Sequence, residues 1–178
     1  MKNTFKSVYI AMLVAIGLVL QVIENSIPVP VSLPGAKLGL ANIASLLTVV
    51  IYGPMTALIV SVVRALLGGL LAGGVSAIPY SFNGAVFSTI VMWLAYRSLV
   101  PRISLIGVSI LGAAAHNTAQ IFTASVILSN SGIYTYLPIL LIIGTITGYF
   151  IGLVANHTVR ILKINLAKQQ KGGRRIIE

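Results

Sequence analysis

The chain has almost no acidic charge and no cysteine. Its two acidic residues, Glu24 and Glu178, lie far apart in sequence, so no carboxylate pair is available to hold magnesium on a diphosphate or to run acid–base hydrolysis. Without cysteine, disulfides and thiolate metal sites are excluded, and an isolated histidine such as His116 or His157 is a poor metal site. No Gly-x-x-x-x-Gly-Lys-Ser/Thr motif is present. We therefore expect no enzymatic activity, no metal and no cofactor, with any ATP used by partner subunits.

Charged residues of either sign are scarce, whereas apolar residues are abundant. Hydrophobic residues make up 57% of the 178 positions and charged residues 8%, against about 25% charged in ordinary globular domains. Such a chain cannot cover a soluble core with polar surface, so the composition predicts an integral membrane protein. Since each helical span needs roughly 20 apolar residues, five or six spans use the whole length. One membrane domain, 1–178, is expected.

Proline, glycine and charge divide this domain into six predicted spans, an all-α bundle of transmembrane helices. The second span is short, at about 15 residues, and is expected either to lie partly buried or not to cross fully. Gly53-Pro54 predicts a tight turn before the third span, because proline suits the start of a helix. The approximate spans are 5–24, 38–52, 54–72, 79–97, 103–128 and 136–163, followed by a basic tail, 164–178.

The basic residues predict the orientation. If the N-terminus is cytoplasmic, ten of the twelve lysines and arginines lie inside, as the positive-inside rule requires. We expect both termini to be cytoplasmic in a bacterial plasma membrane, with the tail contacting anionic lipids and a specific role for the tail as the alternative. Because the basic residues stand at span ends, nucleic acid is not an expected partner. The ten are Lys2, Lys6, Arg97, Arg102, Arg160, Lys163, Lys168, Lys171, Arg174 and Arg175.

Arg64 lies within an otherwise apolar run, 55–72. A guanidinium at the centre of a span costs roughly 3 kcal/mol on insertion scales, so it normally faces a protein interior or a watery cavity. On a helix it shares one stripe with small residues, including Ser61 and Gly68. Arg64 is therefore the first candidate for binding an anionic ligand. The alternatives are bonds to backbone carbonyls within the bundle and snorkelling to one surface.

Other polar residues within the spans fall on stripes that converge on the outer half of the bundle. They predict an outward-open cavity, with the proline-rich segment 25–37 as either a lid or a simple connector. Each Asn or Gln alone is better explained by an interhelical hydrogen bond, typically worth about 1 kcal/mol or less, and it is their convergence that favours a binding site. The predicted substrate-binding residues are Arg64, His116, Asn117, Gln120, Asn83, Tyr80, Asn42, Lys37, Gln21 and Glu24.

Several stretches together resemble the Gx transporter family, also labelled heptaprenyl diphosphate synthase component I. They are Ala11-x-x-x-Ala15, Pro-Gly-Ala-Lys-Leu-Gly-Leu-Ala-Asn at 34–42, Tyr-Gly-Pro at 52–54, Arg-Ala-Leu-Leu-Gly-Gly at 64–69, Tyr-Ser-x-Asn-Gly at 80–84, and Ala-His-Asn-Thr-Ala-Gln at 115–120. The family looks related to the substrate-binding S-components of energy-coupling factor (ECF) transporters, which are six-helix proteins with cytoplasmic termini.

The resemblance implies that Ala11 and Ala15 contact a transmembrane coupling subunit, which two ATPase subunits drive. It also implies that the outer half of the bundle binds a micronutrient such as a vitamin or a quinone-, isoprenoid- or flavin-like molecule. One alternative is a non-catalytic membrane subunit associated with polyprenyl diphosphate synthesis. Another is a scaffold or small channel without a tight ligand.

Overall fold

The computed structural model describes residues 2–26 and 39–174, and every regular element in these two stretches is helical. Short turns of other helix types, Gly69–Gly73, Val75–Ala77 and Ser131–Tyr136, connect or extend the main helices. The predicted all-α class is confirmed. The six main helices are α1 (Lys2–Asn25), α2 (Asn42–Tyr52), α3 (Pro54–Gly68), α4 (Ile78–Leu99), α5 (Leu105–Ile127) and α6 (Leu137–Arg174).

Five helical segments are long and apolar enough to cross a membrane, so the chain is a multi-pass helical membrane protein. The expected second span, 38–52, differs from the others, because helix α2 begins only at Asn42 and has 11 residues. At 1.5 Å per residue it is about 16 Å long, well short of the roughly 30 Å hydrocarbon core. It lies instead inside the bundle, where Leu46 is fully buried. The five segments are Lys6–Asn25, Pro54–Leu71, Val75–Leu99, Leu105–Ile127 and Ser131–Ile164.

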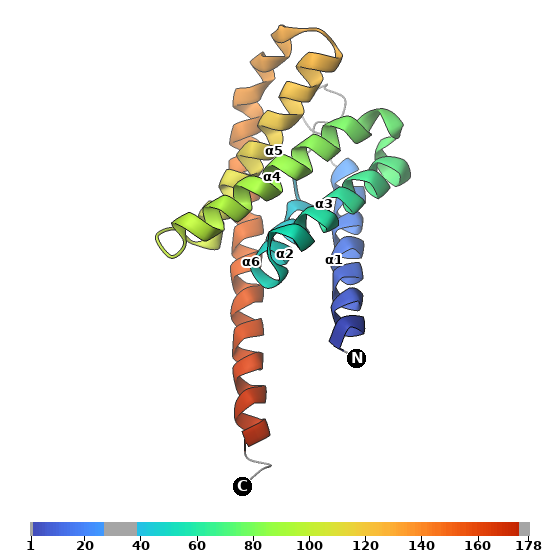
Figure 1. Ribbon diagram of the computed structural model, residues 1–178. Coiled ribbons are helices and arrows are strands. Elements are labelled where there is room, and N and C mark those ends of the chain that lie inside the picture. The colour runs from blue at the N-terminus through green and yellow to red at the C-terminus, as the bar shows by residue number, and fades with distance from the viewer. Residues whose placement is uncertain (1, 27–38, 175–178) are drawn as a thin grey trace.

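Figure 1 shows that the start of α1 and the end of α6 point to the same end of the molecule, while α3 and α4 cross the view obliquely. Helix α5 packs between α4 and α6, and α1 packs against α3 and α2. The last helix runs to Arg174, past the predicted end of the sixth span at 163 and into the predicted tail. Both described chain ends therefore lie at the same end of the molecule.

Two local features position these helices. Gly53 has φ +84°, a conformation that side chains other than glycine rarely adopt, and Pro54 follows as the first residue of α3, so the predicted tight turn is confirmed. At the other end of the chain, Gly148 lets α6 approach α5. A Cβ there would lie 3.0 Å from Ile110 Cα, so the two backbones are almost in contact.

Candidate functional site

Arg64 lies inside the bundle, as its cost in a membrane predicted. Its side chain is only 4% exposed, and Ala57, Ser61 and Gly68 of the same stripe are also buried. The arginine stem passes α1 at Gly17, where a Cβ would stand 2.5 Å from Arg64 Cδ. Glycine at this position therefore makes the space that the arginine occupies.

The guanidinium of Arg64 is only partly satisfied. Its Nη1 donates a 3.0 Å hydrogen bond to Gln21 Oε1 on α1. Its Nε and Nη2 have no hydrogen-bond partner among the described residues. These two nitrogens share one edge of the planar group, so their N–H bonds point in parallel toward one side. We considered above that backbone carbonyls could satisfy the whole guanidinium. Within the described part of the chain, no carbonyl accepts a hydrogen bond from this edge.

A small polar hollow surrounds this edge. It measures about 10 Å³, enough for roughly one water molecule. Five of the ten predicted site residues line it, and they come from four different helices, α1, α2, α3 and α5. The lining residues are Gln21, Glu24, Gly39, Ala41, Asn42, Arg64, Ser81 and His116.

Further polar atoms in this hollow lack partners within the described residues. Both amide atoms of Asn42, the Ser81 hydroxyl and Gln21 Nε2 are buried and make no hydrogen bond there. A buried polar group without a partner costs about 1–3 kcal/mol, so an arrangement of several is expensive unless a ligand or water completes it. Ser81 was missed as a site residue. The signal for it was a stripe on α4, since Ser81, Gly84 and Ser88 recur at steps of three and four.

Glu24 forms the α1 side of this hollow. Its Oε1 accepts a hydrogen bond from the backbone N–H of Gly39, which ties the end of α1 to the chain that enters α2. Its negative charge also attracts the Arg64 guanidinium. Glu24 is the one acid among the described residues that line this hollow.

Glycines on two further helices make space for neighbouring site residues. A Cβ on Gly84 of α4 would lie 2.8 Å from Cε1 of His116, closer than real contacts allow. A Cβ on Gly68 of α3 would overlap the amide of Gln21. The helices can therefore bring long polar side chains between them without separating, which explains why small residues and polar residues alternate along these stripes.

A chain of hydroxyl groups continues from this site into the bundle. Ser61, one turn before Arg64, lies 2.7 Å from the Ser45 hydroxyl of α2 and 2.7 Å from the Thr89 hydroxyl of α4. Thr89 in turn donates to the carbonyl of Ala85. Since these groups satisfy one another, this cluster holds three helices together and presents no open polar surface.

The other predicted site residues lie elsewhere. Asn117 donates a 2.7 Å hydrogen bond to the Leu140 carbonyl of α6, which is the structural alternative left open for such residues. Tyr80 is buried in an apolar cluster with Ile121 and Leu140, and Gln120 is buried but is not among the residues that line the hollow. Lys37, and residues 27–37 of the expected lid, lie outside the described residues.

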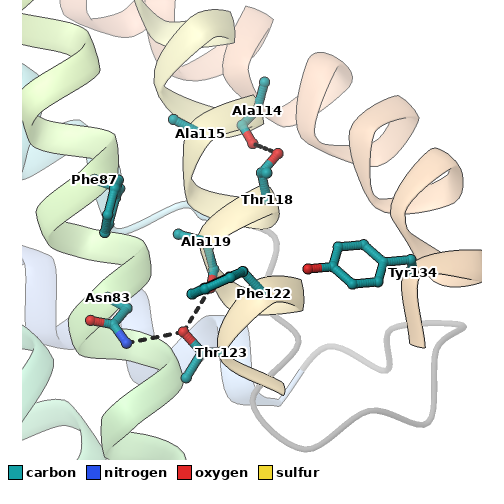
Figure 2. A pocket seen from close by; sticks show the side chains of 9 residues that line it. All are labelled: Asn83, Phe87, Ala114, Ala115, Thr118, Ala119, Phe122, Thr123 and Tyr134. Atoms are coloured by element: carbon teal, nitrogen blue, oxygen red, sulfur yellow. Dashed lines mark hydrogen bonds between the residues drawn. The ribbon is translucent and has the colours of Figure 1, made fainter. Parts of the chain in front are cut away.

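Asn83 lines a second, larger hollow between α4, α5 and the turn Ser131–Tyr136, shown in Figure 2. Its Nδ2 donates to Thr123 Oγ1 at 3.0 Å, and Thr123 donates to the Ala119 carbonyl. This hollow measures about 600 Å³ and shares no lining residue with the polar one. It is lined by Asn83, Phe87, Ala114, Ala115, Thr118, Ala119, Phe122, Thr123 and Tyr134.

The fold and this geometry define a helical membrane protein with a small buried polar site around one arginine. The family model of heptaprenyl diphosphate synthase component I matches residues 13–158, so the chain belongs to that family. The word component in this name implies a partner subunit. The match spans every residue that lines the polar hollow and every residue that lines the larger one. No curated protein and no solved structure shows significant similarity to the chain.

Proposed function

We propose that this chain is the substrate-binding S-component of an ECF-type transporter, which captures a small anionic or amphipathic micronutrient from outside the cell. It is not an enzyme and uses no cofactor, because ATP is hydrolysed by two ATPase subunits on a shared transmembrane coupling subunit. The observation that carries this proposal is the edge of Arg64 that finds no partner among residues 2–26 and 39–174, in a buried hollow built by several helices. Such an edge is costly in a membrane and gains its partners when an anion binds.

The position of the hollow supports capture from outside. It lies at the C-terminal part of α1, and Figure 1 shows this part far from the end where α1 begins and α6 finishes. With both termini in the cytoplasm of a bacterium, as the basic residues predict, the hollow falls in the outer half of the plasma membrane.

The two faces of α1 support a partner. Gly17, Gln21 and Glu24 are buried on one face, whereas Ala11 and Ala15 are exposed on the other. Large apolar residues around these alanines are exposed as well, such as Met12 at 52% and Val19 at 59%. A helix with small residues on an exposed apolar face lets a second helix approach closely, so this face suits the proposed coupling subunit.

The test is co-purification with a coupling subunit and two ATPases expressed in the same cells. We expect the double variant Ala11→Leu and Ala15→Leu to lose all three partners, because two leucines hold the helices apart. Val63→Leu, at another exposed apolar position, is the matched control and should retain them. Equal recovery from the double variant and wild type would contradict the docking face.

Native mass spectrometry of the purified chain tests the binding role separately. We expect a retained small molecule in wild type that disappears in Arg64→Ala. If Arg64→Ala retains the same molecule at the same occupancy, Arg64 is not its binding residue.

A second candidate is a non-catalytic membrane subunit of a polyprenyl diphosphate synthase, which the family name favours. The larger hollow of about 600 Å³, whose walls include Phe87 and Phe122, is of a size and character that hold a hydrocarbon chain. Recovery of a soluble prenyl synthase as the sole partner, with no ATPase, would favour this candidate over the transporter.

A further inference from the structure

We infer that the hollow beside Arg64 recognises the carboxylate group of a monoanionic ligand and discriminates against phosphate. This inference rests on the proposed binding function and deepens it by naming the ligand's charged group. It uses the free edge of the guanidinium, the charge of the lining residues and the size of the hollow.

The free edge of Arg64 fits the two oxygens of one carboxylate. Nη1, on the opposite edge, is already bonded to Gln21 Oε1, so the guanidinium cannot turn this edge outward without losing that bond. Nε and Nη2 remain as two parallel donors, both buried and both without a partner among the described residues. Parallel N–H groups of this kind bind a carboxylate through two simultaneous hydrogen bonds.

The charge of the hollow favours a single negative charge. Among the described residues that line it, Arg64 is the one lysine or arginine and Glu24 the one acid. Since the charges of Arg64 and Glu24 sum to zero, a bound carboxylate brings these groups to a net charge of −1. A phosphate monoester carries about −1.5 to −2 at pH 7, and in a buried site it would meet Glu24 with a single described cation to balance both. A diphosphate would be worse, which sets this site against the diphosphate that the family name mentions.

The neutral groups of the hollow add specificity next to the carboxylate. Asn42 offers a donor and an acceptor that have no partner in the described part of the chain, and Ser81 offers a hydroxyl that can serve as either. These groups match a neutral polar substituent, such as an amide or hydroxyl, close to the carboxylate. At about 10 Å³ the hollow has room for only one water, so it must widen to admit a carboxylate ligand.

The test is an NMR titration of the full chain in nonionic detergent with ¹⁵N-labelled arginine. The Arg64 Nε–H signal is assigned by its disappearance in Arg64→Lys. Benzoate, phenyl phosphate and benzamide are matched probes, because they share one ring and differ in the head group. We expect benzoate to produce a saturable shift of the Arg64 signal and the other two probes to bind at least tenfold more weakly. The signal of Arg97, which is exposed beside Trp93, should not move.

A second measurement uses thermal unfolding. Benzoate should raise the Tm of wild type and fail to raise that of Arg64→Lys, which keeps the positive charge but lacks the paired donors. Val154→Ala, at an exposed apolar position of α6 that lines neither hollow, should respond to benzoate as wild type does. Phenyl phosphate binding as tightly as benzoate, no response of Arg64 to benzoate, or an equal benzoate response in Arg64→Lys would each overturn the inference.

Failure of this inference differs from failure of the proposed function. A ligand that is retained by wild type, lost in Arg64→Ala and identified as a phosphate ester contradicts the carboxylate while leaving the transporter intact. A clear benzoate response in a chain that recovers no coupling subunit supports the carboxylate site and contradicts the transporter.

Discussion

Replacing Arg64 by methionine separates a binding role of the arginine from a structural one. Methionine keeps an unbranched stem and removes the guanidinium. If Arg64 held the bundle together, its loss would leave buried partners unpaired and would cost about 3–5 kcal/mol of unfolding free energy. If the arginine is kept for an absent ligand, the fold should tolerate the replacement while ligand binding is lost.

The magnitude follows from the bonds that Arg64 makes. Two buried nitrogens without partners among the described residues cost roughly 2–6 kcal/mol, and methionine removes that cost. Against this stands the bond to Gln21, worth about 1.5–3 kcal/mol with a charged donor, and the unpaired Gln21 Oε1 left behind, at about 1–3 kcal/mol. The two sides nearly cancel, so we expect the unfolding free energy of Arg64→Met to change by less than about 2 kcal/mol.

The assay is SDS titration of the unfolding equilibrium in mixed micelles, together with the benzoate response. Leu46→Ala is the reference for real destabilisation, since Leu46 is fully buried and such a truncation costs about 2–5 kcal/mol. Removing the orphaned acceptor as well, in the double variant Arg64→Met and Gln21→Leu, should raise stability above that of Arg64→Met. The reasoning is refuted if Arg64→Met is destabilised as much as Leu46→Ala, or if it still binds benzoate.

Three further variants test the packing around this site. Gly17→Ala should push the Arg64 stem away and weaken benzoate binding about 10- to 100-fold, the loss of one charged hydrogen bond, as NMR titration would measure. Ser61→Ala breaks two buried hydroxyl contacts and should lower the unfolding free energy by about 1–2 kcal/mol without changing the benzoate response. Gly148→Ala should cost about 1–3 kcal/mol, because its Cβ meets the Ile110 backbone, which cannot rotate away; unchanged stability would contradict that close approach.

Most of the fold could be predicted because apolar run length is a direct measure of a membrane helix. The first, third, fourth and fifth spans lie close to their predicted positions for this reason. The start of α2 and the end of α6 could not be predicted from apolar run length. Residues 39–41 carry no polar side chain yet precede α2. The residues after 163 mix apolar with polar and charged side chains yet continue α6, since Leu, Ala, Lys and Gln are good helix formers.

Five of the eight residues that line the polar hollow are among the ten predicted site residues, and the other five predicted residues do not line it. Helical periodicity gives the direction in which the side chains of Gln21, Arg64 and His116 point, because each residue stands on a stripe whose opposite side is apolar or packed. One step along a helix turns the side chain by about 100°, and this separates Asn117 from His116. Because α5 is buried by helices on several sides, sequence alone does not say which of its polar residues meets α4 and which meets α6.

Helix α1 joins the two halves of the proposed function. The residues that close the hollow, Gln21 and Glu24, stand on the same rigid helix as Ala11 and Ala15, which face outward about two to three turns away. Since the hollow holds only one water, a ligand cannot enter unless a wall moves, and α1 is the least buried of the five spanning segments. Movement of α1 to admit a ligand would therefore also move the proposed docking face. A scaffold or open channel has no need of such a link, whereas a transporter that must report an occupied site to its partner does.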